Sequence, residues 1–452
     1  MLLGGSAMFD FSKTKEKLTS FQIIILGFVA VILIGAFLLM LPIATKSGES
    51  TPFIKALFTS TSAVCVTGLV IEDTASYWSD FGQTVIIVLI QIGGLGVVSV
   101  ASFITIMSGR KINIKQRQTM QSALSAPQMG GIIKLTRFIF ITAFLLEVVG
   151  VIMMLPVFVP KYGKRGIWLS IFHSISAFCN SGFDLMGDKT GKFSSMTSFS
   201  QNLYMTVVIS FLIVTGGIGF ITWRDVVSKK NHIKEYTMQT KVIIVTTATL
   251  IIIPTLFFFV NDFSDAPFIK RLCTSLFQSI TPRTAGFNNA DLNKMTGSGK
   301  AMTMILMLIG GSPGSTAGGM KTTTIAVLFA NAIAVFRKKQ NANFFGRRMD
   351  DSVIRNAATI LFMYTSVVIL ASISISIIEK MPISACMYEA FSAIGTVGLS
   401  LGITPHLSAP SLYILMGLMF FGRVGGLTLI YAAFSHQDTS MSKYPMENIT
   451  VG

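Results

Sequence analysis

Four long apolar segments recur along this chain, and each is long enough to cross a lipid bilayer as a helix. They are residues 21–41, 135–159, 242–260 and 357–378. Because a membrane-spanning helix needs about 20 apolar residues, the chain is predicted to be a multi-pass membrane protein. The composition agrees, since 51% of the residues are hydrophobic and 12% are charged, about half the charged share of a soluble domain. These values argue against a soluble enzyme and against a secreted disulfide scaffold.

The net charge of +16 comes largely from basic residues that gather in four clusters. The clusters lie in the N-terminal tail and in residues 110–137, 224–241 and 337–355. They recur at every second predicted crossing, which is the positive-inside pattern of a chain with cytoplasmic N- and C-termini. The charge is thereby explained without a nucleic acid, and no nucleic-acid partner is expected. The clusters also form a basic cytoplasmic face on which a soluble partner can dock.

Each long segment is followed by a segment too short to cross and then by a second long apolar run. The second runs are residues 81–107, 203–223, 301–336 and 412–434. This pattern predicts an all-α membrane protein with four helix–half-crossing–helix repeats and eight full spans. The predicted organisation is a cytoplasmic tail at 1–20, repeats at 21–107, 135–223, 242–336 and 357–434, cytoplasmic loops at 108–134, 224–241 and 337–356, and a cytoplasmic C-terminal tail at 435–452.

The four short segments share a pattern that ends in a glycine. They read Ser62-Ala-Val-Cys-Val-Thr-Gly68, Ser176-Ala-Phe-Cys-Asn-Ser-Gly182, Ile280-Thr-Pro-Arg-Thr-Ala-Gly286 and Ser392-Ala-Ile-Gly-Thr-Val-Gly398. Prolines stand 16, 19 and 16 residues before three of these glycines, and proline fits the first turn of a helix. Each segment is therefore predicted to begin as a helix about 18 Å long, which reaches halfway through the bilayer, and to end in extended backbone at its glycine.

Extended backbone at that depth must line a water-filled cavity or be buried in protein. Glycine lets a carbonyl point inward at positive φ, and Thr396-Val397-Gly398 matches the first half of the Thr-Val-Gly-Tyr-Gly potassium filter. Four copies in register favour a ring of carbonyl oxygens that binds cations over re-entrant elements that serve packing alone. The predicted ion-binding residues are Val66, Thr67, Gly68, Asn180, Ser181, Gly182, Thr284, Ala285, Gly286, Thr396, Val397 and Gly398.

With these four motif copies, the chain resembles the membrane subunits of the Ktr type in the Trk/Ktr/HKT superfamily of cation transporters, over nearly its whole length. The resemblance implies a single-chain, pseudo-tetrameric pore of helix–pore-helix–helix repeats that takes up potassium across the cell membrane in a channel-like manner. It implies potassium at the filter, sodium as a second candidate ion, and no covalent cofactor. Gly68 favours potassium, because relatives with serine at this position tend towards sodium. The resemblance also implies a homodimer on a cytosolic ring of nucleotide-binding regulatory subunits of the KtrA type.

The second run of the third repeat is interrupted by a polar, glycine-rich segment at residues 310–324. Such a sequence cannot remain a regular helix, and its hydroxyl groups and lysine cannot face lipid. We predict an intramembrane loop across the conduction path below the filter, and the resemblance implies that this loop acts as a gate. The predicted gate residues are Gly310, Gly311, Ser312, Pro313, Gly314, Ser315, Thr316, Ala317, Gly318, Gly319, Lys321 and, from the fourth repeat, Arg423.

Two arginines lie at membrane depth in the predicted pore. Arg423 either pairs with Glu147 or places a positive charge beneath the filter that resists cation passage, and the resemblance supports the second role. Arg283, beside the third filter glycine, either tunes the mouth of the pore or holds its loop by hydrogen bonds, and the second interpretation is preferred.

Other classes of protein are less consistent with the sequence. Residues 310–314 fit the G-x-S-x-G nucleophile elbow around Ser312, but neither a preceding strand nor a nearby histidine is evident, so an intramembrane serine hydrolase, and enzyme activity generally, is not favoured. A sodium- or proton-coupled secondary carrier with broken helices is a stronger alternative, although four parallel repeats suit a central pore better. The four cysteines lie in apolar surroundings and are interpreted as small membrane residues rather than as metal ligands or disulfides.

Overall fold

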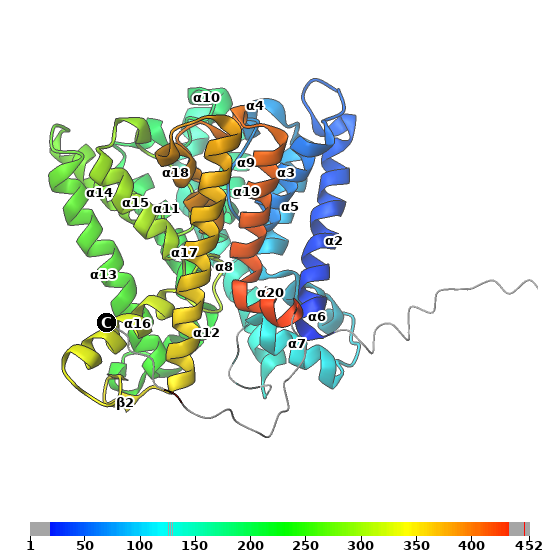
Figure 1. Ribbon diagram of the computed structural model, residues 1–452. Helices are drawn as coiled ribbons and strands as arrows, with labels where there is room; N and C mark the ends of the chain where they lie inside the picture. The colour runs from blue at the N-terminus through cyan, green and yellow to red at the C-terminus, as the bar shows by residue number, and fades with distance from the viewer. Residues whose placement is uncertain (1–18, 125, 127, 129, 434–446, 448–452) are drawn as a thin grey trace, which may run out of the picture.

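The computed structural model describes residues 19–124, 126, 128, 130–433 and 447, so most of the predicted tails at 1–20 and 435–452 lies outside the described residues. The described chain is a bundle of helices (Figure 1). Four helices are long and apolar enough to cross a membrane, and they match the four segments predicted to do so, except that Leu41 follows the end of the first helix. They are α2 (Ser20–Met40), α8 (Ile132–Tyr162), α13 (Met238–Asn261) and α17 (Asp351–Glu379).

A short helix follows each long one and packs against it. The short helices are α3 (Phe53–Val64), α9 (Arg165–Phe178), α14 (Phe268–Ile280) and α18 (Ile383–Ile394). They contain 12 to 14 residues, which is about 18–21 Å and too short to cross. Pro52, Pro267 and Pro382 stand immediately before three of them as N-caps. The predicted half-crossing helices are therefore present.

The second runs of repeats 1, 2 and 4 are not straight helices. Each run breaks at a glycine into two helices that meet at 92°, 95° and 92°. The glycines are Gly96, Gly219 and Gly425, with φ of 86°, 98° and 92°, a conformation that other residues rarely adopt. The helix pairs are α5 (Asp80–Leu95) and α6 (Val97–Met107), α11 (Leu203–Ile218) and α12 (Phe220–Lys229), and α19 (Ala409–Val424) and α20 (Gly426–Ala433).

The third repeat breaks differently, because its second run contains a loop rather than a bend. Helix α15 (Gly297–Leu308) and helix α16 (Thr322–Phe336) flank residues 309–321. The loop was predicted at 310–324, but its last three threonines, 322–324, form the first turn of α16. All four second runs are therefore interrupted, three of them by a bend and the third by a loop.

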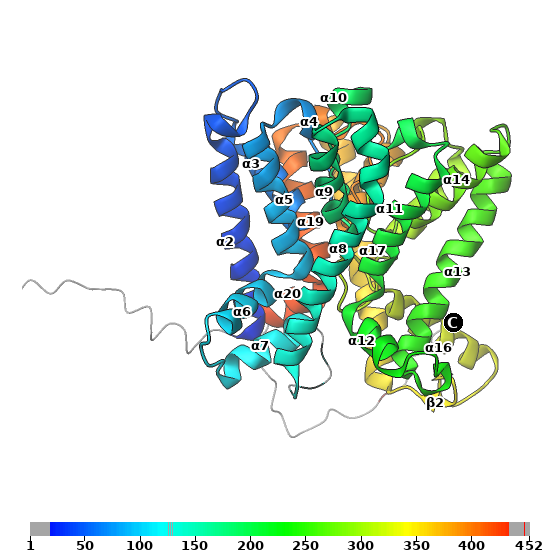
Figure 2. The same ribbon diagram turned by 180° about the vertical axis from the view of Figure 1, so that it is seen from behind.

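The bent helices α6, α12 and α20 lie at one end of the bundle together with α7 (Ile114–Leu124) and the hairpin of β1 (Asn343–Phe344) and β2 (Arg347–Arg348) (Figures 1 and 2). At the other end lie α4 (Thr74–Tyr77) and α10 (Gly187–Thr190). Short 3₁₀ turns complete the described chain at Pro42–Ala44, Thr197–Phe199, Ile233–Glu235, Leu292–Lys294 and Thr404–His406.

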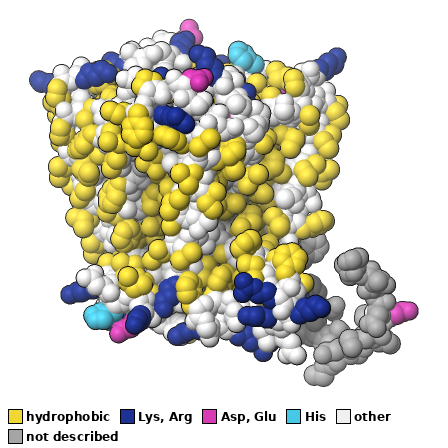
Figure 3. Space-filling view, turned by 90° about the vertical axis from the view of Figure 1, so that its left-hand side faces the viewer, with side chains coloured by type: hydrophobic (Ala, Val, Ile, Leu, Met, Phe, Trp, Pro, Cys, Tyr) yellow, Lys and Arg dark blue, Asp and Glu magenta, His cyan; other side chains and the backbone are white. Residues whose placement is uncertain are grey.

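The surface between the two ends is apolar. Figure 3 shows a broad band of hydrophobic side chains, with Lys and Arg concentrated above and below it. Large apolar side chains on the long helices are well exposed, such as Phe362 of α17 at 73%, which a chain in water avoids over so wide an area. The band is the surface that a lipid bilayer covers, so the described chain is a multi-pass membrane protein with the predicted all-α, four-repeat architecture.

Candidate functional site

The four filter glycines meet around one axis. Each of them touches the carbonyl oxygen of the residue that precedes the filter glycine of the next repeat, and the fourth repeat closes back onto the first. A Cβ atom built on any of them would lie 2.2–2.8 Å from that oxygen, so glycine alone fits at these positions. The contacting pairs are Gly68 with Ser181, Gly182 with Ala285, Gly286 with Val397, and Gly398 with Thr67.

The backbone of the four extended stretches has the same local conformation in every repeat. The glycines have φ between 71° and 93°, and the residue two positions before each glycine also has a positive φ. Positive φ is uncommon for residues other than glycine and is strained for β-branched ones. These residues, two positions before the glycines, are Val66 with φ of 50°, Asn180 with 56°, Thr284 with 70° and Thr396 with 52°. The four extended stretches therefore share one backbone pattern, in which two left-handed residues are separated by a single residue.

Hydroxyl groups at the ends of the short helices hold these stretches in place. In repeats 1 and 4 the glycine N–H donates to a serine Oγ six residues earlier, Ser62 and Ser392, at 3.0 Å in both cases. In repeat 2, Ser176 Oγ donates to Phe183 O at 2.6 Å. Repeat 3 has Ile280 at the serine position, and Thr281 Oγ1 donates to Phe287 O at 2.5 Å instead. The recurring serine is visible in the sequence, but its role as a brace was not predicted.

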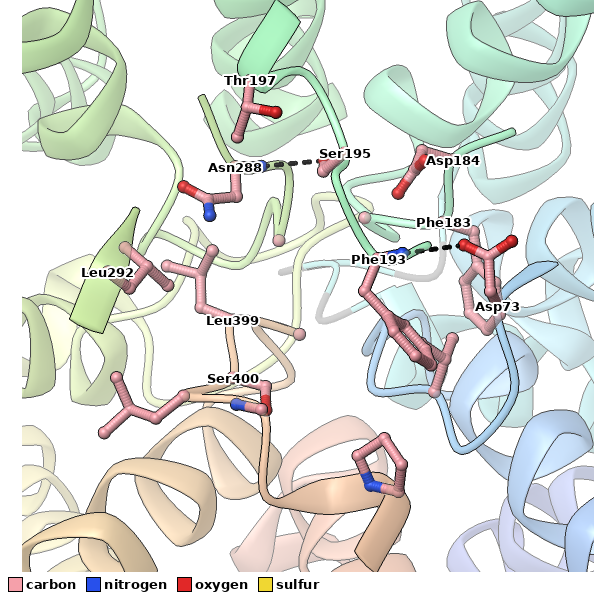
Figure 4. A pocket seen from close by; sticks show the side chains of 18 of the residues that line it. Asp73, Phe183, Asp184, Phe193, Ser195, Thr197, Asn288, Leu292, Leu399 and Ser400 are labelled. Carbon is pink, nitrogen blue, oxygen red and sulfur yellow. Dashed lines mark hydrogen bonds between the residues drawn. The ribbon is translucent and has the colours of Figure 1, made fainter. Parts of the chain in front are cut away.

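A cavity of about 380 Å³ opens on the side of the ring that carries α4, and all four filter glycines line it (Figure 4). Its wall includes the carboxyl groups of Asp73, Asp184 and Asp291, and the described residues that line it include neither lysine nor arginine. Asp73 accepts hydrogen bonds from Phe193 N at 3.0 Å and Ser76 N at 2.9 Å. Carboxyl groups around a narrow mouth raise the local concentration of cations. Sequence reasoning missed these residues, although Asp73 and Asp291 each follow their filter glycine by five positions.

The predicted gate loop lies directly beneath the ring. Thr316 Oγ1 donates to the carbonyl of Phe178, the last residue of α9, at 2.9 Å. A Cβ on Gly318 would lie 2.2 Å from Thr396 Oγ1, in the fourth filter stretch. The loop therefore touches the filter and the end of a short helix at the same time.

Backbone hydrogen bonds fix the loop to the neighbouring repeats. Ser312 N and Thr316 N donate to Gly217 O and Gly216 O of repeat 2, at 2.9 and 3.2 Å. Gly314 O accepts from Phe220 N at 2.8 Å. Other bonds close the loop on itself or join it to repeat 4: Gly310 N to Met320 O at 2.7 Å, Thr322 N to Gly311 O at 3.1 Å, Ser315 Oγ to Ser312 O at 2.6 Å, Lys321 Nζ to Ala317 O at 2.8 Å, and Gly319 N to Gly422 O at 3.1 Å.

Arg423 joins the loop to repeat 1. Its guanidinium donates to Thr316 O in the loop and to Gly93 O and Gly94 O at the end of α5. It lines a second cavity, of about 220 Å³, on the inner side of the loop together with Lys321. The alternative pairing with Glu147 is wrong, because that carboxyl accepts its hydrogen bond from Gln91 Nε2 at 2.8 Å.

The remaining sequence candidates are placed as follows. Arg283 is 6% exposed, and its Nε has no hydrogen-bond partner, so the preferred interpretation that it holds the loop by hydrogen bonds finds no support at that atom. Ser312 Oγ bonds Thr322 Oγ1 at 3.1 Å, whereas His173 bonds the backbone of Leu169 and Leu185. A serine–histidine pair is therefore not assembled in the described part of the chain. All four cysteines are buried with free thiols.

Comparison with known proteins points to one family. The model of the family described as TrkH, cation transport protein, matches residues 1–444. The chain is 40% identical to the potassium/sodium uptake protein NtpJ of Enterococcus hirae, over 97% of this chain and 99% of that protein. It is 38% identical to the Ktr system potassium uptake protein B of Bacillus subtilis, over 96% and 97%. The structure resembles the potassium transporter TrkH from Vibrio parahaemolyticus with a TM-score of 0.72 at 17% identity, covering 91% of this chain and 83% of that one.

Proposed function

The chain belongs to the TrkH family of cation transport proteins, a family of transporters and not of enzymes, and from this premise we propose that it takes up potassium through the ring of filter carbonyls. Transport is channel-like: ions pass along the axis of the four repeats and are driven by the electrochemical gradient. No covalent cofactor takes part.

The observation that carries this proposal is the closed cycle of glycine–carbonyl contacts between consecutive repeats. Backbone carbonyls that point at one axis replace the hydration shell of a cation, which is how potassium filters select their ion. The C-terminal ends of the short helices add partial negative charge beside the same axis. The twelve predicted filter residues, at 66–68, 180–182, 284–286 and 396–398, are proposed as the ion-binding site.

Potassium is the preferred ion in this proposal, and sodium is a secondary one. All four filter positions carry glycine, and the similar proteins of Bacillus subtilis and Enterococcus hirae are named for uptake of potassium and of potassium and sodium, respectively. Each repeat supplies one glycine to the filter rather than the two of a five-residue potassium filter. Fewer well-ordered sites should therefore discriminate less strictly against sodium.

The loop at 309–321 and Arg423 are proposed to close the pathway from below. The loop touches the filter, and a positive charge in a narrow pore raises the energy of a passing cation. Glycine-rich backbone can switch between two arrangements at small cost, so the same segment can also open.

Control of this gate is proposed to come from outside the chain. The similarity to a Ktr system protein supports a homodimer that stands on a cytosolic ring of nucleotide-binding regulatory subunits of the KtrA type. These regulatory subunits would dock on the basic end of the bundle. The exposed basic residues there include Lys338, Lys339, Arg347 and Arg348. This end is assigned to the cytoplasm by its charge, and the first described residues of α2 lie there as well (Figure 1).

Growth of potassium-starved cells that lack their own potassium uptake systems tests the proposed function. Cells that produce this chain should grow at low external potassium and should accumulate the ion, whereas cells with the empty vector should not. A matched control is the Gly286→Ala variant, in which the new methyl group would meet Val397 O at 2.2 Å and distort the ring, so that uptake should discriminate less between potassium and sodium. Failure of the wild-type chain to support uptake, with the protein detected in the membrane, would refute the proposal.

A further inference from the structure

Glu147 is an acidic side chain in the middle of a span whose neighbours face lipid. It is 5% exposed, whereas Phe144, one turn earlier in α8, is 69% exposed. A carboxyl group at this depth is costly unless it has a polar partner. None of the ion pairs among the described residues includes Glu147, and the hydrogen bond that it accepts comes from Gln91 of α5.

Gln91 joins two repeats through both ends of its amide group. Its Nε2 donates to Glu147 Oε1 at 2.8 Å, and its Oε1 accepts from Cys179 Sγ at 3.5 Å. Glu147 and Cys179 belong to repeat 2, on α8 and just after α9, while Gln91 belongs to repeat 1. The three side chains therefore hold α5 against the C-terminal end of the neighbouring short helix.

In the cluster of Glu147, Gln91 and Cys179, the last two residues lie next in sequence to two sets of backbone acceptors that hold the gate loop and Arg423. Gly93 and Gly94 follow Gln91 by two and three residues. Their carbonyl oxygens accept hydrogen bonds from Arg423. Cys179 follows Phe178, whose carbonyl oxygen accepts from Thr316 Oγ1. A shift of α5 relative to α9 would thus move the acceptors of the gate loop and of its arginine apart.

The internal repeat shows that packing alone does not require a carboxyl group here. Ser174 Oγ donates to Glu147 O at 2.6 Å, and Ser60 Oγ donates to Ile32 O at 2.7 Å. Both serines stand eight residues before their filter glycine, so Ile32 in repeat 1 is the equivalent of Glu147 in repeat 2. Ile32 is buried at 6% exposure, which shows that an apolar side chain can fill this position in the fold.

We propose that Glu147 and Gln91 are a positioning pair that stabilises the closed gate. By holding α5 and the end of α9 in register, the pair keeps the acceptors of Arg423 and Thr316 where the gate loop needs them. This inference rests on the proposed function, because it requires a conducting pore with a gate. Glu147 itself stays away from the ion path and acts through the backbone of its neighbours.

Basal potassium flux into liposomes that contain the purified chain without any regulatory partner tests the pair. Glu147→Leu and Gln91→Leu should each raise this flux about fivefold, which corresponds to about 1 kcal/mol, the net value of one hydrogen bond. The double variant should show no further increase, since each change already breaks the pair. Glu147→Leu added to Arg423→Ala should raise the flux by less than the product of the two single effects, because part of the effect of the pair passes through Arg423.

Conservative variants separate positioning from general stability. Glu147→Gln keeps an acceptor for Gln91 Nε2, and the exchange Glu147→Gln with Gln91→Glu rebuilds the pair, so both should stay within about twofold of the wild-type flux. Ser372→Ala is the matched control, because Ser372 is 1% exposed on α17 and donates to Val368 O of its own helix. This control should leave the basal flux unchanged, as should any loss of a buried hydroxyl away from the gate.

Two results would overturn the inference. The first is a basal flux in both leucine variants that equals the wild-type flux. The second is a flux of the Glu147→Leu, Arg423→Ala double variant that equals the product of the two single effects, because sites that act independently add their free energies. If the wild-type protein and every variant failed to conduct potassium, the proposed function itself would fall. If the wild-type protein conducted and the leucine variants matched it, the function would stand and the positioning pair would not.

Discussion

The filter ring and the layer directly beneath it are built from the same four repeats but obey different rules. In the ring, every repeat contributes a glycine at positive φ, a second left-handed residue two positions before it, and the same contact to the next repeat. In the layer below, three repeats bend sharply at a glycine, and the third opens into a loop at 309–321. The fourth repeat places Arg423 where repeats 1 and 2 have Gly94 and Gly217.

This difference separates two tasks. In the proposed filter, carbonyls from four sides would surround a cation on the axis, so selectivity needs repeats that are alike. A gate has to block the axis and then leave it, which one loop can do while the other three repeats hold still. The symmetric layer is therefore assigned to selection and the asymmetric layer to closure, and substitutions in the two layers should give different phenotypes.

Shortening the gate loop should have the largest effect on the comparison. Deletion of residues 313–316 removes the Thr316 contact to α9, and the chain beside the new junction is already close together, because a Cβ on Gly311 would lie 2.3 Å from Ala317 Cβ. We expect basal flux to rise about a hundredfold, which corresponds to about 3 kcal/mol, with the potassium-to-sodium ratio retained. A lower flux in stable, inserted protein would show instead that the loop supports the filter.

Arg423→Ala should raise basal flux by a smaller factor. A unit charge about 5 Å from an ion is worth roughly 3 kcal/mol at an effective dielectric of 20, but the carbonyl groups that contact the guanidinium offset part of this field. An increase of about tenfold is therefore expected in the liposome assay. Arg423→Lys, which keeps the charge, should remain closer to the wild type. Equal flux in the alanine, lysine and wild-type proteins would remove the arginine from the gate.

Charge reversal at the basic end should weaken binding of the regulatory partner by a few fold. Arg347→Glu with Arg348→Glu changes the sign of exposed groups on β2, and the loss should shrink as salt is added because exposed charges are screened. Lys192→Glu, at the opposite end of the bundle, is the matched control. Sedimentation with the purified partner measures the binding. Equal binding by the two variants would contradict this assignment, and so would tight binding of nucleotide by the chain alone.

Ser312→Ala should have the smallest effect, and it separates the gate from a hydrolase. The substitution removes the hydrogen bond between Ser312 Oγ and Thr322 Oγ1, while the backbone bond from Ser312 N to Gly217 O stays. Basal flux should change by at most about fivefold, the value of one hydrogen bond. If Ser312 were the nucleophile of a hydrolase, the same substitution would abolish hydrolytic activity and leave the potassium flux unaffected.

The four-repeat plan and the short helices could be predicted from the sequence because their determinants are local. Apolar length decides which segments span, and the glycine with its preceding proline marks where a short helix starts and where extended backbone ends. Gly68, Gly182, Gly286 and Gly398 align without gaps in their motifs, and the structure brings them together at one axis.

The bends at Gly96, Gly219 and Gly425 could not be predicted in the same way. The residues on both sides of each glycine are apolar, so hydropathy shows one continuous run. The bends follow a repeated spacing, Gly93 to Gly96, Gly216 to Gly219 and Gly422 to Gly425. The first glycine of each pair touches the last carbonyl of its own short helix, at 2.0–2.1 Å from a built Cβ. That contact is tertiary, and periodicity along one chain does not show it.

The hydrogen-bond partners of the charged side chains could not be predicted from the sequence either. Arg423 and Glu147 are the kind of pair that opposite charge favours, yet Arg423 binds carbonyl groups and Glu147 binds an amide. Backbone oxygens freed at the glycine breaks provide those acceptors, and such oxygens carry no signature in residue identity. The acidic mouth formed by Asp73, Asp184 and Asp291 depends in the same way on loops that meet in three dimensions.

The ratio of potassium to sodium flux through purified Gly68→Ser protein in liposomes tests the central claim most directly. The new Cβ would lie 2.3 Å from Ser181 O, so the neighbouring carbonyl must leave the ring and one side of the filter is lost. We predict that the ratio falls by about tenfold or more, about 1.4 kcal/mol of discrimination, while the gate loop still limits basal flux. An unchanged ratio in folded, inserted protein would contradict a filter built from these four glycines.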